Sequence, residues 1–254
     1  MLTNFFNSTG HGKHAPYRFI INLMIKAKIA IPLILVLILG IFPVQLDLYN
    51  AGQCIGDAVS CPSNTTQLEA YAFVLKMQPW RDELWQQAGK VAYDQQNWAI
   101  AEELLTIAEE KYAIDRLGIQ MLAEAHLYNG NTDTGIEYML ALMERGQLPT
   151  QDYRELYNLL LTDFRVTEAE EVAVAWLAEE PRNADAQLYL GLVQLTRDHF
   201  EAIQNLELAS ALESSLQPFV RDIDLAITQA HLSNDASYQQ LLIGRELANQ
   251  GYTV

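Results

Sequence analysis

A repeat of 34 residues is the sequence feature that most constrains the fold of this chain. Gly89, Ala123, Tyr157 and Gly191 are separated by 34 positions each, and each lies midway along a stretch with the apolar spacing of a helix. A single helical unit of this length would leave its apolar face in water, so neighbouring units must stack to bury a continuous core. The sequence therefore predicts an all-α solenoid of antiparallel helix pairs.

The repeated units share small and large residues at fixed positions: the small ones allow paired helices to approach closely, and Trp, Tyr and Leu fill the space between pairs. In the best unit, residues 79–113, these positions hold Trp85, Ala88 and Gly89 in the first helix and Trp98, Ala101, Leu105 and Ala108 in the second. In residues 184–217 the equivalent positions hold Gly191, Phe200, Ala202 and Ala209, with one residue fewer between the helices. The two middle units are more degenerate, with Gly135 in place of an alanine and Trp176 in place of a small residue.

This pattern resembles that of the tetratricopeptide repeat (TPR) family, in which Trp, Leu-Gly, Tyr, Ala, a large apolar residue and Pro recur in order. The resemblance covers residues 65–250 and implies about eleven antiparallel helices. The array would open with a half repeat at 65–78 and close with a helix pair at 218–232 and 236–249. In the last helix, Ser237 and Gly244 take the two small-residue positions. Residues 251–254 follow as a short tail.

An apolar segment before the repeats predicts one transmembrane helix. Residues 29–46 contain no charge and, as a helix, would be about 27 Å long, which matches the apolar core of a bilayer. A cleaved signal peptide is the alternative, but the bulky or polar residues 44–50 offer no small-x-small cleavage site, which favours an uncleaved anchor.

Charge predicts how this anchor is oriented. The four cations of residues 1–46 all precede the apolar segment, and no acid occurs there. The positive-inside rule then predicts a basic cytoplasmic tail, residues 1–28, and an extracytoplasmic location for residues 47–254. The location expected is a bacterial-type inner membrane, with the repeats on its periplasmic side.

The linker between membrane and repeats, residues 47–64, holds the only two cysteines, Cys54 and Cys61. In an oxidising compartment they are expected to form a disulfide that closes a loop of about eight residues. Two cysteines alone make a poor metal site, so no zinc or redox role is expected.

Motifs that carry chemistry are missing from the sequence. It contains no glycine-rich phosphate loop, no GxSxG elbow and no HExxH pair. His126, His199 and His231 each lack a second ligand three or four residues away, so structural roles are expected for them. The net charge is −16, and with +4 on residues 1–46 the rest carries −20, which disfavours nucleic-acid binding. We expect no enzyme activity, no cofactor and no metal.

The resemblance to TPR proteins implies a concave surface lined by the first helix of each repeat. The positions in phase with such a groove are Gln86, Lys90, Tyr93, Gln120, Tyr128, Arg154 and Asn158. Asp94 and Glu124 lie among them, so the family's dicarboxylate clamp, which needs converging basic residues, is not expected here. Tyr93 and Tyr128 are 35 residues apart and should fall on successive repeats, either as partner contacts or as cover for the seam between helices.

These features predict a membrane-anchored scaffold or adaptor that binds other proteins, with envelope or membrane-complex components as its partners. The alternative is a structural subunit of an integral membrane complex, in which the transmembrane helix packs within the complex and the repeats form a peripheral cap. A third possibility is a regulatory or targeting half of an enzyme whose catalytic part is another chain.

Overall fold

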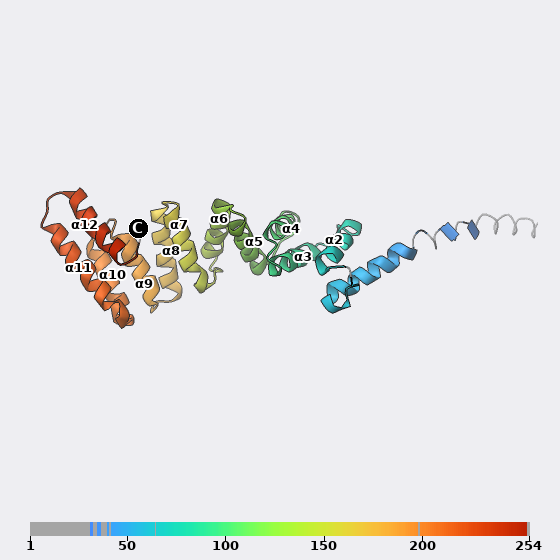
Figure 1. Ribbon diagram of the computed structural model, residues 1–254, viewed down its shortest axis with the longest axis horizontal. Coiled ribbons are helices and arrows are strands. Elements are labelled where there is room, and N and C mark those ends of the chain that lie inside the picture. The colour runs from blue at the N-terminus through green and yellow to red at the C-terminus, as the bar shows by residue number, and fades with distance from the viewer. Residues whose placement is uncertain are drawn as a thin grey trace, which may run out of the picture. The chain divides into compact units, whose positions relative to one another are not determined.

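The computed structural model describes residues 31–32, 35–36, 40, 42–63, 65–197 and 199–252. Within these ranges, residues 42–56 are helical, eleven further α-helices follow from α2 to α12, and no β-strand occurs (Figure 1). This confirms the predicted all-α fold and its number of helices. The chain divides into two compact units, Met1–Arg81 and Asp82–Val254, and each is described by itself below.

The first unit contains the disulfide loop and helix α2 (Gln67–Met77). Cys54 and Cys61 form the predicted disulfide, with their Cα atoms 4.3 Å apart, and Cys54 has no exposed surface. Thr66 caps α2 reciprocally: its Oγ1 accepts from the Glu69 N–H at 3.2 Å, and its own N–H donates to Glu69 Oε2 at 2.7 Å. The cap satisfies two amides that a helix start otherwise leaves unpaired.

The predicted membrane helix, residues 29–46, lies partly outside the described residues. The predicted cytoplasmic tail, residues 1–28, and residues 253–254 lie wholly outside them. Residues 42–46, at the end of the predicted span, belong to the helical stretch that continues to residue 56. Within the described ranges, no helix combines the length and the apolar character that crossing a membrane requires.

The second unit is a row of helix pairs. Its α-helices are α3 (Glu83–Asp94), α4 (Trp98–Lys111), α5 (Arg116–Tyr128), α6 (Thr132–Glu144), α7 (Tyr153–Thr162), α8 (Val166–Glu179), α9 (Ala184–Gln194), α10 (His199–Leu212), α11 (Gln217–His231) and α12 (Ala236–Asn249). Single turns of 3-10 helix, Thr150–Asp152 and Ser214–Leu216, precede α7 and α11. Each helix contacts the next one along the chain, as in a solenoid (Figure 1).

The 34-residue period is visible in the backbone of the turns within each pair. Gln96, Gly130 and Phe164, spaced by 34, all have positive φ angles, of 58°, 82° and 59°. The N–H of each donates to the carbonyl three residues earlier, at 2.8, 3.0 and 3.0 Å, which closes the preceding helix. Only glycine adopts this conformation cheaply, so Gln96 and Phe164 hold strain of roughly 1 kcal/mol each.

The two helices of a pair pack through complementary residue sizes. An ideal Cβ on Gly89 would lie 2.6 Å from Leu105 Cγ, and one on Gly191 would lie 2.7 Å from Leu206 Cγ. The equivalent positions in the two middle pairs hold Ala123 with Met139 and Tyr157 with Ala173, all buried in one core cluster. A small residue on one helix is therefore matched by a larger one on the other.

The degenerate middle units keep their packing through further exchanges of this kind. Gly135 brings α6 close to α5, since a Cβ there would lie 2.6 Å from Leu127 Cδ2. Trp176 is only 4% exposed and its ring stacks at 6.0 Å on Tyr153 and at 6.1 Å on Tyr189. Trp176 therefore fills the space between α8 and its neighbours α7 and α9.

Three assignments at the C-terminal end of the array are wrong. Ser237 and Gly244 are exposed, and α12 instead packs through Ile243 and Leu247. No atom lies within 4 Å of a Cβ built on Gly244, because no later helix pair in the described chain covers that side of α12. Phe200, expected among the packing positions of α10, is 73% exposed.

Candidate functional site

The seven predicted groove residues all lie on the first helices of successive pairs. Helix α3 carries Gln86, Lys90 and Tyr93, helix α5 carries Gln120 and Tyr128, and helix α7 carries Arg154 and Asn158. The structure joins several of them through contacts between helices, so they are not equally available to a partner.

A chain of hydrogen bonds links α3, α5 and the turn before α7. The Tyr93 hydroxyl donates to the Glu124 carboxylate, and Gln120 Nε2 donates to both Glu124 Oε1 at 3.2 Å and Asp152 Oδ2 at 3.1 Å. Burial and the bond to Glu124 raise the pKa of Tyr93. Burial, followed by repulsion from Glu124, raises the pKa of Asp152. Tyr93 and Gln120 therefore hold successive repeats together.

Gln86 has a similar role between α3 and the start of α5. Its Nε2 donates to Asp115 Oδ1 at 2.6 Å, and the same oxygen accepts from the Gly118 N–H at 2.8 Å to cap α5. A Cβ on Gly118 would lie 3.0 Å from Gln86 Nε2, so the glycine leaves room for this contact.

Aromatic side chains gather where the turn of the first pair meets the end of α5. Trp98 lies between the two predicted tyrosines: Tyr93 packs edge-on against it at 5.2 Å and Tyr128 stacks on it at 4.2 Å with planes 14° apart. Tyr128 is 65% exposed. The tyrosines thus meet at one indole rather than lining separate pockets. The repeat pattern marks Trp98 only as a packing residue; its position five residues after Tyr93, across the turn between α3 and α4, is the signal that could have revealed the contact.

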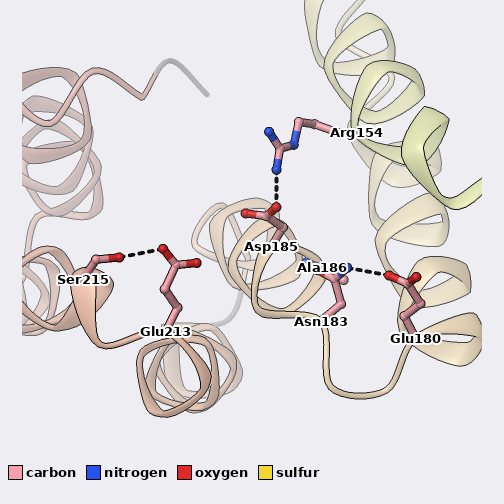
Figure 2. A network of polar contacts seen from close by, with 7 residues as sticks. All are labelled: Arg154, Glu180, Asn183, Asp185, Ala186, Glu213 and Ser215. Carbon is pink, nitrogen blue, oxygen red and sulfur yellow. Dashed lines mark hydrogen bonds and ion pairs between the residues drawn. The ribbon is translucent and has the colours of Figure 1, made fainter.

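The second exposed part of the site lies along α7. Arg154 forms an ion pair with Asp185 of α9 (Figure 2), and its guanidinium carbon lies 5.9 Å from the centre of the Tyr189 ring. Arg154 and Asn158 line an open depression of about 350 Å³ together with Gln151, Glu155, Leu159 and Thr162. Lys90 is exposed on α3.

The start of α9, which presents Asp185 to Arg154, is held by its own cap. Asn183 Oδ1 accepts from the Ala186 N–H at 3.0 Å, and Asn183 Nδ2 donates to Glu180 Oε2 at 2.5 Å (Figure 2). At the left of the same view, Ser215 donates to Glu213 at 2.6 Å before α11. The cap therefore fixes the start of α9, from which Asp185 pairs with Arg154.

A second row of polar contacts joins the turns within the second, third and fourth pairs to the second helix of the preceding pair. Glu102 accepts from Asn131 at 3.0 Å, Arg165 contacts Glu137 at 2.8 Å, and Arg197 pairs with Glu170. These contacts recur at nearly the repeat period and stabilise the stacking of pairs. They leave the exposed parts of α3, α5 and α7 as the candidate binding surface.

Two histidines that appear isolated in the sequence come together in the structure. His199 begins α10 and His231 ends α11, and His199 Nδ1 lies 3.2 Å from His231 Nε2. The sequence alone does not reveal the pair, because the two histidines are 32 residues apart rather than one helical turn apart. His126 is buried as expected, stacked on Tyr138 and 3.3 Å from Glu102.

The fold and the site define an all-α solenoid of TPR-like helix pairs. No protein-family model matches the chain, and no curated protein matches it in sequence. A solved structure of the MamA protein is similar, with 16% identity, a TM-score of 0.50, and coverage of 69% of this chain and 94% of that one. YrrB, described as a TPR protein with an unusual peptide-binding site, aligns at 16% identity and a TM-score of 0.49 over 61% and 81% of the two chains. The likeness to MamA supports the fold.

Proposed function

We propose that this chain is a membrane-anchored scaffold that binds other proteins through the exposed face of α3, α5 and α7, and that it acts without catalysis. The observation that carries the proposal is the exposed Tyr128 ring stacked on Trp98. An aromatic side chain that is fixed in place offers a partner a large contact area at little cost in side-chain entropy.

The depression along α7 supports the same proposal from a second position. Its polar lining includes Arg154 and Asn158, which can hydrogen-bond the backbone or an acidic side chain of an extended segment. Because Arg154 is already paired with Asp185, a partner would have to share or replace that carboxylate. We therefore expect Tyr128 and Asn158 to contribute more to binding than Arg154.

We further propose that residues 29–46 anchor the chain in a bacterial-type inner membrane, with residues 1–28 in the cytoplasm and the repeats outside. The excess of cations before the apolar segment supports this orientation. The Cys54–Cys61 disulfide also supports it, because disulfides persist in oxidising compartments. Envelope or membrane-complex proteins are then the partners expected.

The test is site-specific photocrosslinking in native membranes, with the reactive residue at Tyr128 in one sample and at Tyr238 in another. Tyr238 is a matched control because it is 48% exposed on α12, outside the proposed surface. We expect a discrete crosslinked protein at Tyr128 and none at Tyr238. Crosslinks at Tyr238 alone would move the binding surface to the end of the array and refute the proposal.

Detergent extraction of the same membranes distinguishes a scaffold from a structural subunit of a membrane complex. After detergent extraction, a permanent subunit stays with its complex in native mass measurement, whereas a scaffold that recruits partners is recovered largely without them. Protease added outside spheroplasts tests the orientation, and protection of the repeats would reverse it.

A further inference from the structure

We propose that His199 and His231 form a binding site for a divalent transition-metal ion, of the Zn²⁺ class, between the fourth and fifth helix pairs. The inference is independent of the groove on α3, α5 and α7. It rests on the position of the two imidazoles, their spacing and the charge of the surrounding unit.

The two imidazoles come from helix ends that the fold brings together. His199 is the first residue of α10 and His231 the last residue of α11, and these two helices contact each other. The ring centres lie 5.3 Å apart, and the facing nitrogens, His199 Nδ1 and His231 Nε2, are 3.2 Å apart. The first imidazole is half-buried and the second exposed, so an ion can reach the pair from solvent.

The spacing of the facing nitrogens is that of two ligands on one ion. A tetrahedral ion with metal–nitrogen distances of about 2.0–2.1 Å holds its nitrogen ligands about 3.3 Å apart. Without an ion, one of the facing nitrogens must carry a proton and donate it to the other. When that proton moves to the far nitrogen of its own ring, both lone pairs converge on one point, and the side chains need little rearrangement to bind.

The ligand set decides which ions fit. Neutral imidazole suits Zn²⁺, Cu²⁺ and Ni²⁺, whereas Mg²⁺ and Ca²⁺ prefer oxygen ligands. Residues 82–254 contain 29 of the 32 acids and only 10 of the 16 Lys and Arg residues, so the unit attracts cations as a whole.

Two protein ligands leave coordination positions open for water or for an atom of a partner. Among the described residues there is no group of three or more protein ligands, so the ion is expected to exchange readily. Since it would bridge α10 and α11 only when both are folded, it should raise the melting temperature of the array.

The test is titration with Zn²⁺ of the full chain, purified in detergent without a polyhistidine tag. His11 and His14 lie three residues apart near the N-terminus and can bind metal themselves, so the reference protein is His11→Gln/His14→Gln. We expect the reference to bind about one Zn²⁺ per chain and to melt at a higher temperature with zinc. In this background, His199→Gln or His231→Gln should each weaken binding at least about tenfold. Mg²⁺ should not bind at this site.

A rescue variant distinguishes a lost ligand from a lost fold. His231→Cys replaces the imidazole by a thiolate, which is also a zinc ligand, and should therefore retain the ion. Circular dichroism should match the reference for all three variants. The proposal is overturned if the reference shows no saturable zinc uptake, if His231→Gln binds as tightly as the reference, or if His231→Cys binds no better than His231→Gln.

Discussion

Replacing Gly89 by alanine tests the close approach of α3 and α4, on which the packing of the first pair depends. The added Cβ would lie 2.6 Å from Leu105 Cγ and 2.7 Å from its Cδ2. Carbon atoms normally pack at about 3.5–4.0 Å, so a gap of roughly 1 Å must open. Leu105 has no exposed surface and cannot swing into solvent.

The magnitude follows from two opposing effects. Overpacking of a well-packed core costs about 1–3 kcal/mol, and the better helix propensity of alanine returns about 1 kcal/mol. Gly89→Ala should therefore lower the free energy of unfolding by roughly 1 kcal/mol. Gly244→Ala is the matched control, because Gly244 also lies within a helix but has no atom within 4 Å of the added Cβ. It should gain the propensity without the clash and stabilise the array by up to about 1 kcal/mol.

The assay is thermal and urea unfolding followed by circular dichroism at neutral pH. In a unit of this size, each kcal/mol shifts the melting temperature by about 2–4 °C, so the two variants should differ by several degrees. Leu105→Ala alone should cost about 2–5 kcal/mol, and adding Gly89→Ala to it should cost less than the sum, because the methyl then enters the space that Leu105 leaves. If Gly89→Ala raises the melting temperature as much as Gly244→Ala does, the close approach is refuted.

Three other variants test separate features. Phe164→Gly should stabilise the array by roughly 0.5 kcal/mol in urea unfolding, since it relieves a positive φ at a side chain that is 88% exposed, and a loss of stability would contradict the strain. The folded-state pKa of Asp152 is raised above its unfolded value, so the folded protein favours the protonated carboxyl. The stability that this group contributes is therefore fully present below the unfolded pKa and is lost as pH rises through the folded pKa. Asp152→Asn should therefore melt above the parent at pH 7 and lose this advantage near pH 3, whereas a difference independent of pH would exclude a charge effect. Thr66→Ala removes the reciprocal cap of α2 and should cost about 1 kcal/mol, seen as faster amide exchange in α2 with α3 to α12 unchanged.

The binding surface was predictable only in outline. The phase of the repeats placed all seven groove residues on first helices, because side chains 34 residues apart occupy equivalent positions in a solenoid. It did not reveal that Gln86 donates a hydrogen bond to Asp115 and Gln120 one to Asp152. Nor did it reveal the hydrogen bond from Tyr93 to Glu124. Those contacts depend on how each pair is rotated against the next, and the repeat period does not contain that rotation.

By itself the sequence determined the helical class, the number of helices and the disulfide. It also determined the small residues Gly89 and Gly191, at which the two helices of a pair approach closely. These properties follow from local spacing: apolar residues at helical intervals, turns at a fixed period and two cysteines seven positions apart. Only the tertiary structure decided which side chains meet between repeats, as at Tyr128 on Trp98 and His199 beside His231. Residues about 30 positions apart come within hydrogen-bonding distance only when the twist between pairs and the side-chain rotamers agree, and both are set by the packing of the whole core.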